Sequence, residues 1–133
     1  MNDAVLGLCV ARILITKDRG SMRKALRALL LTRPHWQVCD EAEDGSEAVK
    51  KAAQLVPDLI VMDFRMHDVD GLRAANEIFR RMPSVPIVMY TMYKNEELET
   101  TAKLVGIRRL IGKEEGALTL MRAIEAELQA AQA

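Results

Sequence analysis

The chain has 133 residues, half of which are hydrophobic, and its 19 Lys and Arg residues balance its 19 Asp and Glu residues. This length is typical of one domain with a proper core, which excludes a second domain of similar size and overall disorder. The formal net charge of zero argues against the broad basic surface with which proteins bind nucleic acids or anionic membranes.

The two cysteines, Cys9 and Cys39, lie far apart in the chain, with no CxxC motif and no neighbouring His. This spacing favours two buried thiols over a zinc site or a disulfide framework. The first ten residues contain no Lys or Arg, and no apolar run approaches the roughly 18 residues of a membrane-spanning helix. We therefore expect a cytoplasmic protein that does not contact a membrane.

In the first half of the chain, short apolar runs alternate with segments of helical spacing. A strand is predicted at residues 13–15 and a weaker one at 36–39, and residues 22–30 between them carry apolar side chains at helical spacing. The segment Asp44–Glu47 resembles a capping box for the next helix. A strand at 59–62 is apolar on both faces, as expected where helices cover both faces of a parallel sheet.

The second half of the chain repeats this alternation. A helix with an apolar face is predicted over residues 72–82 and a strand over 85–90. The following helix, around 95–104, is the poorest in apolar residues and is therefore expected to be the most exposed. A weaker strand at 107–111 and a final helix with apolar spacing over 118–128 complete the pattern.

Five such β/α units predict the fold class α/β, with a doubly wound five-stranded parallel sheet and helices on both faces. The chain is too short for the six-stranded dinucleotide-binding version, so we expect the strand order 2-1-3-4-5. Residues 1–133 would form a single domain, with its core at about 11–129. In such sheets, ligands bind beyond the carboxyl ends of the strands, where the strand order reverses between strands 1 and 3.

Polar residues with complementary chemistry stand at that edge. Lys17 and Asp18 follow strand 1, Asp63 ends strand 3, Thr91 ends strand 4 and Lys113 follows strand 5. One carboxylate there can attack phosphorus and a second can hold a divalent cation, while a hydroxyl and an ammonium can meet the phosphoryl oxygens. The set therefore predicts acceptance of a phosphoryl group.

From about residue 12 to residue 128, the chain resembles the response-regulator receiver domain of two-component signalling. The most specific stretch is PDLIVMDFRMHDVDG, residues 57–71, which resembles the phosphoacceptor segment of that family with Asp63 as the phosphorylated residue. Thr91, in VPIVMYTMYKNEE, matches the switch hydroxyl, and Lys113, in GIRRLIGKEE, matches the essential lysine.

The resemblance implies that Asp63, Thr91 and Lys113 form the catalytic set. It also implies that a magnesium ion binds Asp18, Asp63 and the backbone carbonyl of Arg65. A histidine kinase or a phosphotransfer protein would supply the phosphoryl group, and the domain would signal to a downstream protein without contacting nucleic acid itself. A homodimer is compatible with this interpretation. The domain is not expected to be an enzyme, since Arg65 stands where aspartyl phosphatases carry a second Asp as general acid.

Two of the residues that depart from the family pattern lie at key positions of the predicted site. Lys17 replaces the first of two adjacent acids, of which only Asp18 is kept, and Leu110 replaces the usual switch Phe or Tyr. The ammonium of Lys17 can either pair with Asp63 and compete with magnesium, or point into solvent. A spoiled acidic pocket leaves open an alternative function, a pseudo-receiver that acts as a phosphorylation-independent protein-interaction module.

Overall fold

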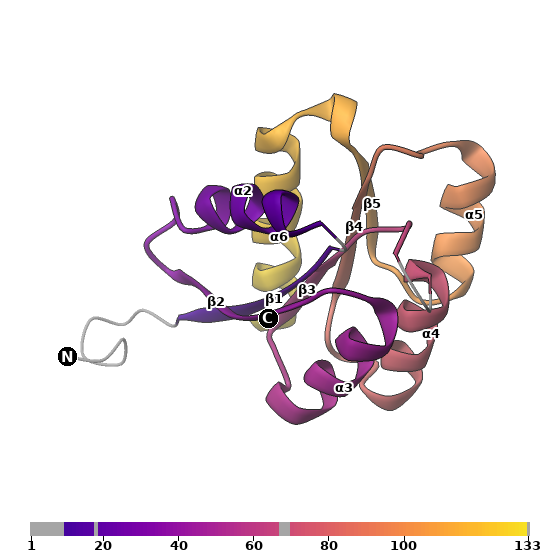
Figure 1. Cartoon of the computed structure of the whole chain (residues 1–133), viewed down its shortest axis with the longest axis horizontal. Coiled ribbons are helices and arrows are strands. Elements are labelled where there is room, and N and C mark those ends of the chain that lie inside the picture. The colour runs from indigo at the N-terminus through magenta and orange to yellow at the C-terminus, as the bar shows by residue number, and fades with distance from the viewer. Residues whose placement is uncertain (1–9, 18, 67–69, 133) are drawn as a thin grey trace.

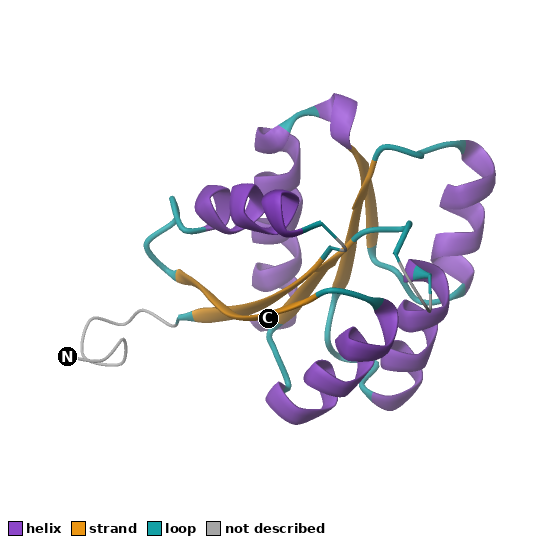
Figure 2. Cartoon of the chain, viewed as in Figure 1, coloured by secondary structure: helices purple, strands orange, loops and turns teal. Residues whose placement is uncertain are grey.

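The computed structural model describes residues 10–17, 19–66 and 70–132, so the sequence-based statements on Cys9 and Asp18 lie outside the described residues. The described chain contains a five-stranded sheet in the order β2-β1-β3-β4-β5, in which all neighbouring strands are parallel. Helices cover both of its faces (Figures 1 and 2). The predicted fold class and strand order are confirmed.

The elements follow the predicted alternation of strands and helices. In chain order they are β1 (Ala11–Thr16), α2 (Gly20–Leu30), β2 (Trp36–Ala42), α3 (Gly45–Leu55), β3 (Leu59–Met62), α4 (Gly71–Arg81), β4 (Ile87–Thr91), α5 (Glu96–Leu104), β5 (Arg109–Gly112), the 3-10 helix η1 (Lys113–Glu115) and α6 (Ala117–Gln132).

Alternate residues of the strands face two separate hydrophobic cores. Ile13 and Ile15 of β1 pack with the apolar faces of α2 and α6, whereas Leu14 between them packs with α3 and α4. In Figure 1, α2 and α6 accordingly lie on one face of the sheet and α3 and α4 on the other. The central strand β3 is fully buried because both of its faces are covered.

Helix starts agree with the sequence except for one capping detail. Asp44 is the N-cap of α3 and accepts from the backbone N–H of Glu47. The carboxylate of Glu47, however, accepts from the backbone N–H of Glu43 and not from that of Asp44, so the predicted capping box is only half formed. The helix start is still satisfied, because each carboxylate takes up one otherwise unpaired N–H group.

Two of the strand boundaries that differ from the predictions have a clear physical cause. β2 continues beyond residue 39 through the polar Asp40 and Glu41, because an edge strand exposes one side to water. β4 begins at Ile87 and not at Val85, since Pro86 has no N–H to donate to a neighbouring strand.

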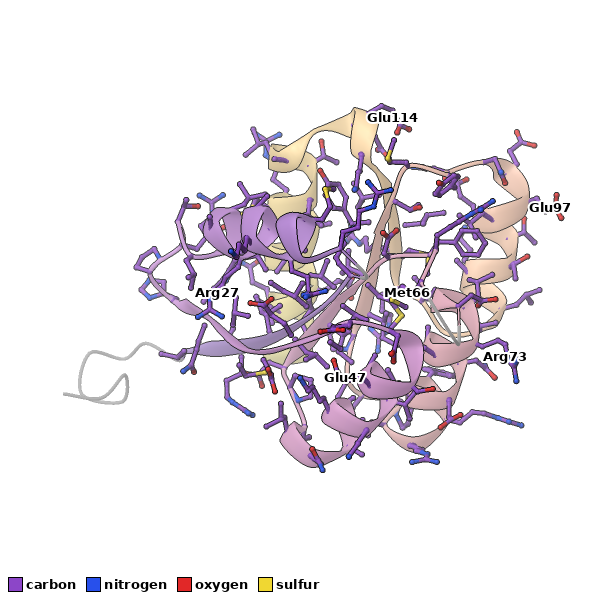
Figure 3. The ribbon with its side chains drawn as sticks, in the orientation of Figure 1. Arg27, Glu47, Met66, Arg73, Glu97 and Glu114 are labelled. Carbon is purple, nitrogen blue, oxygen red and sulfur yellow. The ribbon has the colours of Figure 1, made fainter. Side chains whose placement is uncertain are left out.

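Helix α5 exposes most of its residues, but its burial does not set it apart from the other helices as predicted, since α2 likewise has only two buried residues among those described, Leu26 and Leu30. Only Leu98 and Ala102 are buried in α5, and acidic side chains fill its first turn. Figure 3 shows Glu97 at the outer edge of the molecule. In the described part of the chain, no helix is both long and apolar enough to cross a lipid bilayer.

Candidate functional site

The site lies at the carboxyl edge of the sheet, where β1 and β3 end side by side. Thr16, the last residue of β1, is paired with Met62, the last residue of β3. The backbone N–H of Asp63 donates to the carbonyl of Thr16 at 3.1 Å. The parallel register therefore brings Lys17 and Asp63, each one residue beyond its strand, to the same point.

The neighbouring strands bring Thr91 and Lys113 to this edge. Thr91 ends β4 and is paired with Gly112, the last residue of β5, so that Lys113 follows directly. The structure thus brings Lys17, Asp63, Thr91 and Lys113 to one edge, as predicted, whereas Asp18 lies outside the described residues.

Lys17 points inward and pairs with Asp63. Its Nζ lies 3.6 Å from Oδ2 of Asp63, and the two side chains are 2% and 16% exposed. The same Nζ donates a hydrogen bond of 2.9 Å to the backbone carbonyl of Tyr90. Of the two arrangements open from the sequence, the structure therefore has the paired one.

Contacts from two other elements hold the backbone of Lys17 in place. Its N–H donates to the carbonyl of Ala42 at 3.1 Å, and its carbonyl accepts from Nη1 of Arg23 at 2.7 Å. Arg23 is itself held by Glu41, whose Oε1 lies 3.3 Å from its Nε. Both the backbone and the ammonium of Lys17 are thus fixed before any ligand arrives.

Burial lowers the pKa of Lys17 to about 8. The carboxylate of Asp63 opposes this change by favouring the ammonium, while the positive charge of Lys113 adds to it. A group with a pKa near 8 is still mainly protonated at pH 7, so Lys17 faces Asp63 as an ammonium.

The carboxylate of Asp63 has a distinct partner at each oxygen. Oδ1 accepts from the backbone N–H of Phe64 at 2.8 Å, while Oδ2 faces Lys17 at 3.6 Å. The latter distance is longer than a normal hydrogen bond, so Oδ2 keeps its lone pairs for another partner. Because the side chain is 16% exposed, a small group can reach it from solvent.

Two ammonium groups lie over one tyrosine ring. Nζ of Lys17 is 5.1 Å from the ring centroid of Tyr90, and Nζ of Lys113 is 5.8 Å from it. The negative face of an aromatic ring attracts both cations, which helps to hold two like charges in one place. The sequence analysis missed this role of Tyr90; its position directly before Thr91 was the only signal.

Thr91 connects the site to the aromatic residues of the neighbouring loops. Its fully buried hydroxyl accepts from the backbone N–H of Tyr93 at 3.1 Å. The ring of Tyr93 meets Phe64 edge-on, with centroids 6.3 Å apart, and lies 4.7 Å from the guanidinium carbon of Arg65. Leu110, at the position where the resemblance to receiver domains implies a switch aromatic, is only half-buried. A tyrosine in the β4–α5 loop thus contacts the residues that follow Asp63.

The described surroundings of Asp63 disfavour a magnesium ion. Magnesium prefers an octahedron of oxygen ligands and often takes only one or two carboxylates together with water, and of the two predicted carboxylate ligands only Asp63 is among the described residues. Next to the carboxylate of Asp63 lies the buried ammonium of Lys17, which repels a divalent cation. Asp18, the other predicted carboxylate ligand, lies outside the described residues.

A protein-family model described as the response regulator receiver domain matches residues 13–125. The chain is 34% identical over 113 residues to the transcriptional regulatory protein LnrK of Bacillus subtilis, a match that covers 85% of this chain and 51% of that protein. It is 37% identical over 110 residues to protein-glutamate methylesterase/protein-glutamine glutaminase 2 of Carboxydothermus hydrogenoformans, covering 82% and 31%. The chain thus spans about half or less of these curated relatives.

Solved structures show the same similarity. A two-component response regulator of the LuxR family from Aurantimonas sp. superimposes with a TM-score of 0.88 at 29% identity, covering 91% of this chain and 86% of that one. The response regulator domain of Thermotoga maritima CheB gives 0.80 at 30% identity, covering 93% and 98%.

Proposed function

Because the chain belongs to the response regulator receiver domain family of two-component signalling, we propose that Asp63 accepts a phosphoryl group from the phosphohistidine of a partner protein. Phosphorylation then changes the surface with which the domain binds its downstream protein. The partner is a histidine kinase or a phosphotransfer protein. The domain is a phosphoryl acceptor and not an enzyme that releases a product.

One observation carries this proposal. A partly exposed carboxylate stands at the end of a fully buried central strand, with two ammonium groups and a hydroxyl at the same sheet edge. Preorganised cations and hydrogen-bond donors stabilise the negative charge that develops on a transferred phosphoryl group. The carboxylate of Asp63 is the nucleophile. The ammonium groups of Lys17 and Lys113 and the hydroxyl of Thr91 are the hydrogen-bond donors.

The transfer step balances as a simple displacement. Oδ2 of Asp63 attacks phosphorus, an O–P bond forms, and the P–N bond to the imidazole of the partner breaks. The electron pair of that bond returns to the imidazole nitrogen, which takes up a proton from water. The products are an acyl phosphate on Asp63 and a neutral histidine on the partner.

The experiment that tests this proposal is intact-mass measurement after incubation with acetyl phosphate or phosphoramidate. The native protein is expected to gain the mass of one phosphoryl group, and Asp63→Asn is expected to gain none. Asp58→Asn is the matched control, since Asp58 lies at the opposite end of β3, where its Oδ2 accepts from the N–H of Arg12 at 2.7 Å. A gain that persists in Asp63→Asn, or one mapped to Asp58, contradicts the assignment.

The pairing of Lys17 with Asp63 favours a second candidate function. An ion pair at the acceptor oxygen can hold the domain in one state, and the domain then binds its protein partner without phosphorylation. This pseudo-receiver function predicts that the native protein gains no mass with either phosphodonor. The same experiment therefore decides between the two functions.

A further inference from the structure

We propose that the ammonium of Lys17 supplies the positive charge that a divalent cation would supply in this pocket, so that Asp63 accepts a phosphoryl group without any metal ion. This inference rests on the proposed phosphoacceptor function. It starts from the buried cationic side chain that lies beside the acceptor carboxylate, where it repels a divalent cation.

The formal charge of the pocket agrees with this role. The charge of one ammonium equals the sum of the charges of one ionised carboxylate and one divalent cation. A metal-free pocket with Lys17 therefore has the same formal charge as a metal-loaded pocket with an acid at this position. The phosphoryl dianion therefore enters a pocket with the same total charge in both cases. In the pocket with Lys17, a side chain that the fold holds in place carries the positive charge.

The geometry of Lys17 fits a resident cation better than an inhibitory ion pair. Its Nζ is tied to the carbonyl of Tyr90 at 2.9 Å but stays 3.6 Å from Oδ2 of Asp63. The charge is thus close to the acceptor oxygen without a short hydrogen bond to it. A displacement at Oδ2 needs no prior rupture of such a bond, and an ammonium has three N–H groups, of which two stay free to turn toward the phosphoryl oxygens.

The ammonium groups of Lys17 and Lys113 both lie near the ring of Tyr90. The two Nζ atoms lie 5.1 and 5.8 Å from the same ring centroid. Two ammonium groups near one another repel, and an anion with several oxygens that lies between them relieves this repulsion. No proton leaves Lys17 in the transfer step; it donates hydrogen bonds to phosphoryl oxygens whose charge grows as the P–N bond breaks.

The test compares phosphorylation in EDTA with phosphorylation in magnesium, using the whole chain and phosphoramidate as the donor. Intact mass against time gives the rate for native protein, Lys17→Met, Lys17→Arg and Lys17→Asp. Lys103→Met serves as the control, because it removes an exposed lysine of α5 at the end of that helix remote from its N-cap. Far-ultraviolet circular dichroism checks that each variant is folded.

The native protein and Lys103→Met are expected to be modified in EDTA at rates within about threefold of those in magnesium. Lys17→Met is expected to be slower in EDTA by about 100-fold, the usual effect of removing one preorganised donor. Lys17→Arg keeps the positive charge and is expected to recover part of the rate. Lys17→Asp restores the second acid and is expected to react only in magnesium.

Two results overturn the inference and leave the proposed function intact: modification of the native protein in magnesium but not in EDTA, or equal rates for native protein and Lys17→Met in EDTA. If Lys17→Met does not fold, the comparison of EDTA with magnesium in the native protein decides the metal question by itself. No modification of the native protein under either condition refutes the phosphoacceptor function, and the inference with it.

Discussion

A methyl group on Gly71 would lie 2.1 Å from the carbonyl oxygen of Asp63. The first residue of α4 therefore packs directly against the backbone that carries the carboxylate of Asp63. The N–H of Gly71 also donates to the carbonyl of Phe64 at 2.8 Å. Any side chain at residue 71 would push two backbone segments apart, so the position of Asp63 depends on the absence of a Cβ atom there.

We accordingly expect Gly71→Ala to lower the free energy of unfolding by about 1–3 kcal/mol, as overpacking does in tight sites. The displaced backbone should also slow phosphorylation of Asp63. Chemical denaturation and the rate of mass gain measure the two effects. Gly20→Ala is the control, since its Cβ would make only an ordinary contact of 3.5 Å with Arg23. Equal stability of the two variants contradicts this account.

Lys113→Ala is expected to leave the fold intact and to weaken the phosphorylation-dependent response. Three phosphoryl oxygens near Asp63 need fixed cations in a partly desolvated pocket. The expected cost is on the order of 1–3 kcal/mol, the value for a lost charge-assisted hydrogen bond. The measurement is the ratio of phosphorylation rates, with circular dichroism as the check of folding. An unchanged rate would mean that Lys17 alone supplies the required positive charge.

Magnesium should bind weakly to the native protein and clearly more tightly to Lys17→Asp. Opposite charges about 4 Å apart attract by roughly 4 kcal/mol at an effective dielectric near 20, before desolvation is counted. A cation must compete with this pairing of Lys17 and Asp63. Titration of magnesium against backbone amide shifts gives both affinities. Equal binding by the two proteins shows that Lys17 does not hinder the metal.

The buried lysine also predicts how stability depends on pH. The pKa of Lys17 is about 8 in the folded protein, against 10.5 for a lysine that is free in water. Between these pH values the unfolded chain binds more protons than the folded one, so stability rises with pH. The cost of burying the ammonium is fully present below pH 8.

Relative to Lys17→Met, the native protein should therefore gain stability as the pH rises from about 8 to 10.5, by up to roughly 3 kcal/mol. Urea denaturation of both proteins across this range measures the difference, in which the titration of all other groups largely cancels. A difference that stays constant with pH contradicts the lowered pKa of Lys17.

Thr91→Val should break the connection between the site and the aromatic contacts of Tyr93. Valine keeps the shape of the side chain but leaves the N–H of Tyr93 without its acceptor, at a cost of about 1 kcal/mol. The hydroxyl accepts that bond and keeps its own proton for a phosphoryl oxygen. We expect the amide signal of Tyr93 to shift on phosphorylation in the native protein and in Thr91→Ser, and not in Thr91→Val.

Much of the architecture can be predicted from the sequence, because the spacing of apolar residues along the chain indicates where strands and helices form. The alternation of apolar runs and helical spacing predicts the α/β fold, and the chain length together with the topology rules for parallel sheets predicts the strand order. The same pattern places Asp63, Thr91 and Lys113 just at or beyond strand ends, and parallel strands end at one edge. These features need no knowledge of side-chain packing.

Errors arose where the outcome depends on hydrogen-bond geometry. The carboxylate of Glu47 binds the N–H of Glu43 instead of completing a capping box with Asp44. The polar residues Asp40 and Glu41 hid the end of β2, since only the finished sheet shows that this strand lies at an edge. In each case the backbone has more than one possible hydrogen-bonding arrangement, and the spacing of residues along the chain does not show which arrangement forms.

The direction of Lys17 was decided by the tertiary structure alone. Its long stem reaches either solvent or the pocket with similar local cost, so the sequence by itself determined only that a lysine follows β1. The carbonyl of Tyr90 lies on β4, and the carboxylate of Asp63 directly follows β3. These two acceptors and the burial of the stem select the inward position against the repulsion from Lys113, because an ammonium loses its water there only where such partners replace it.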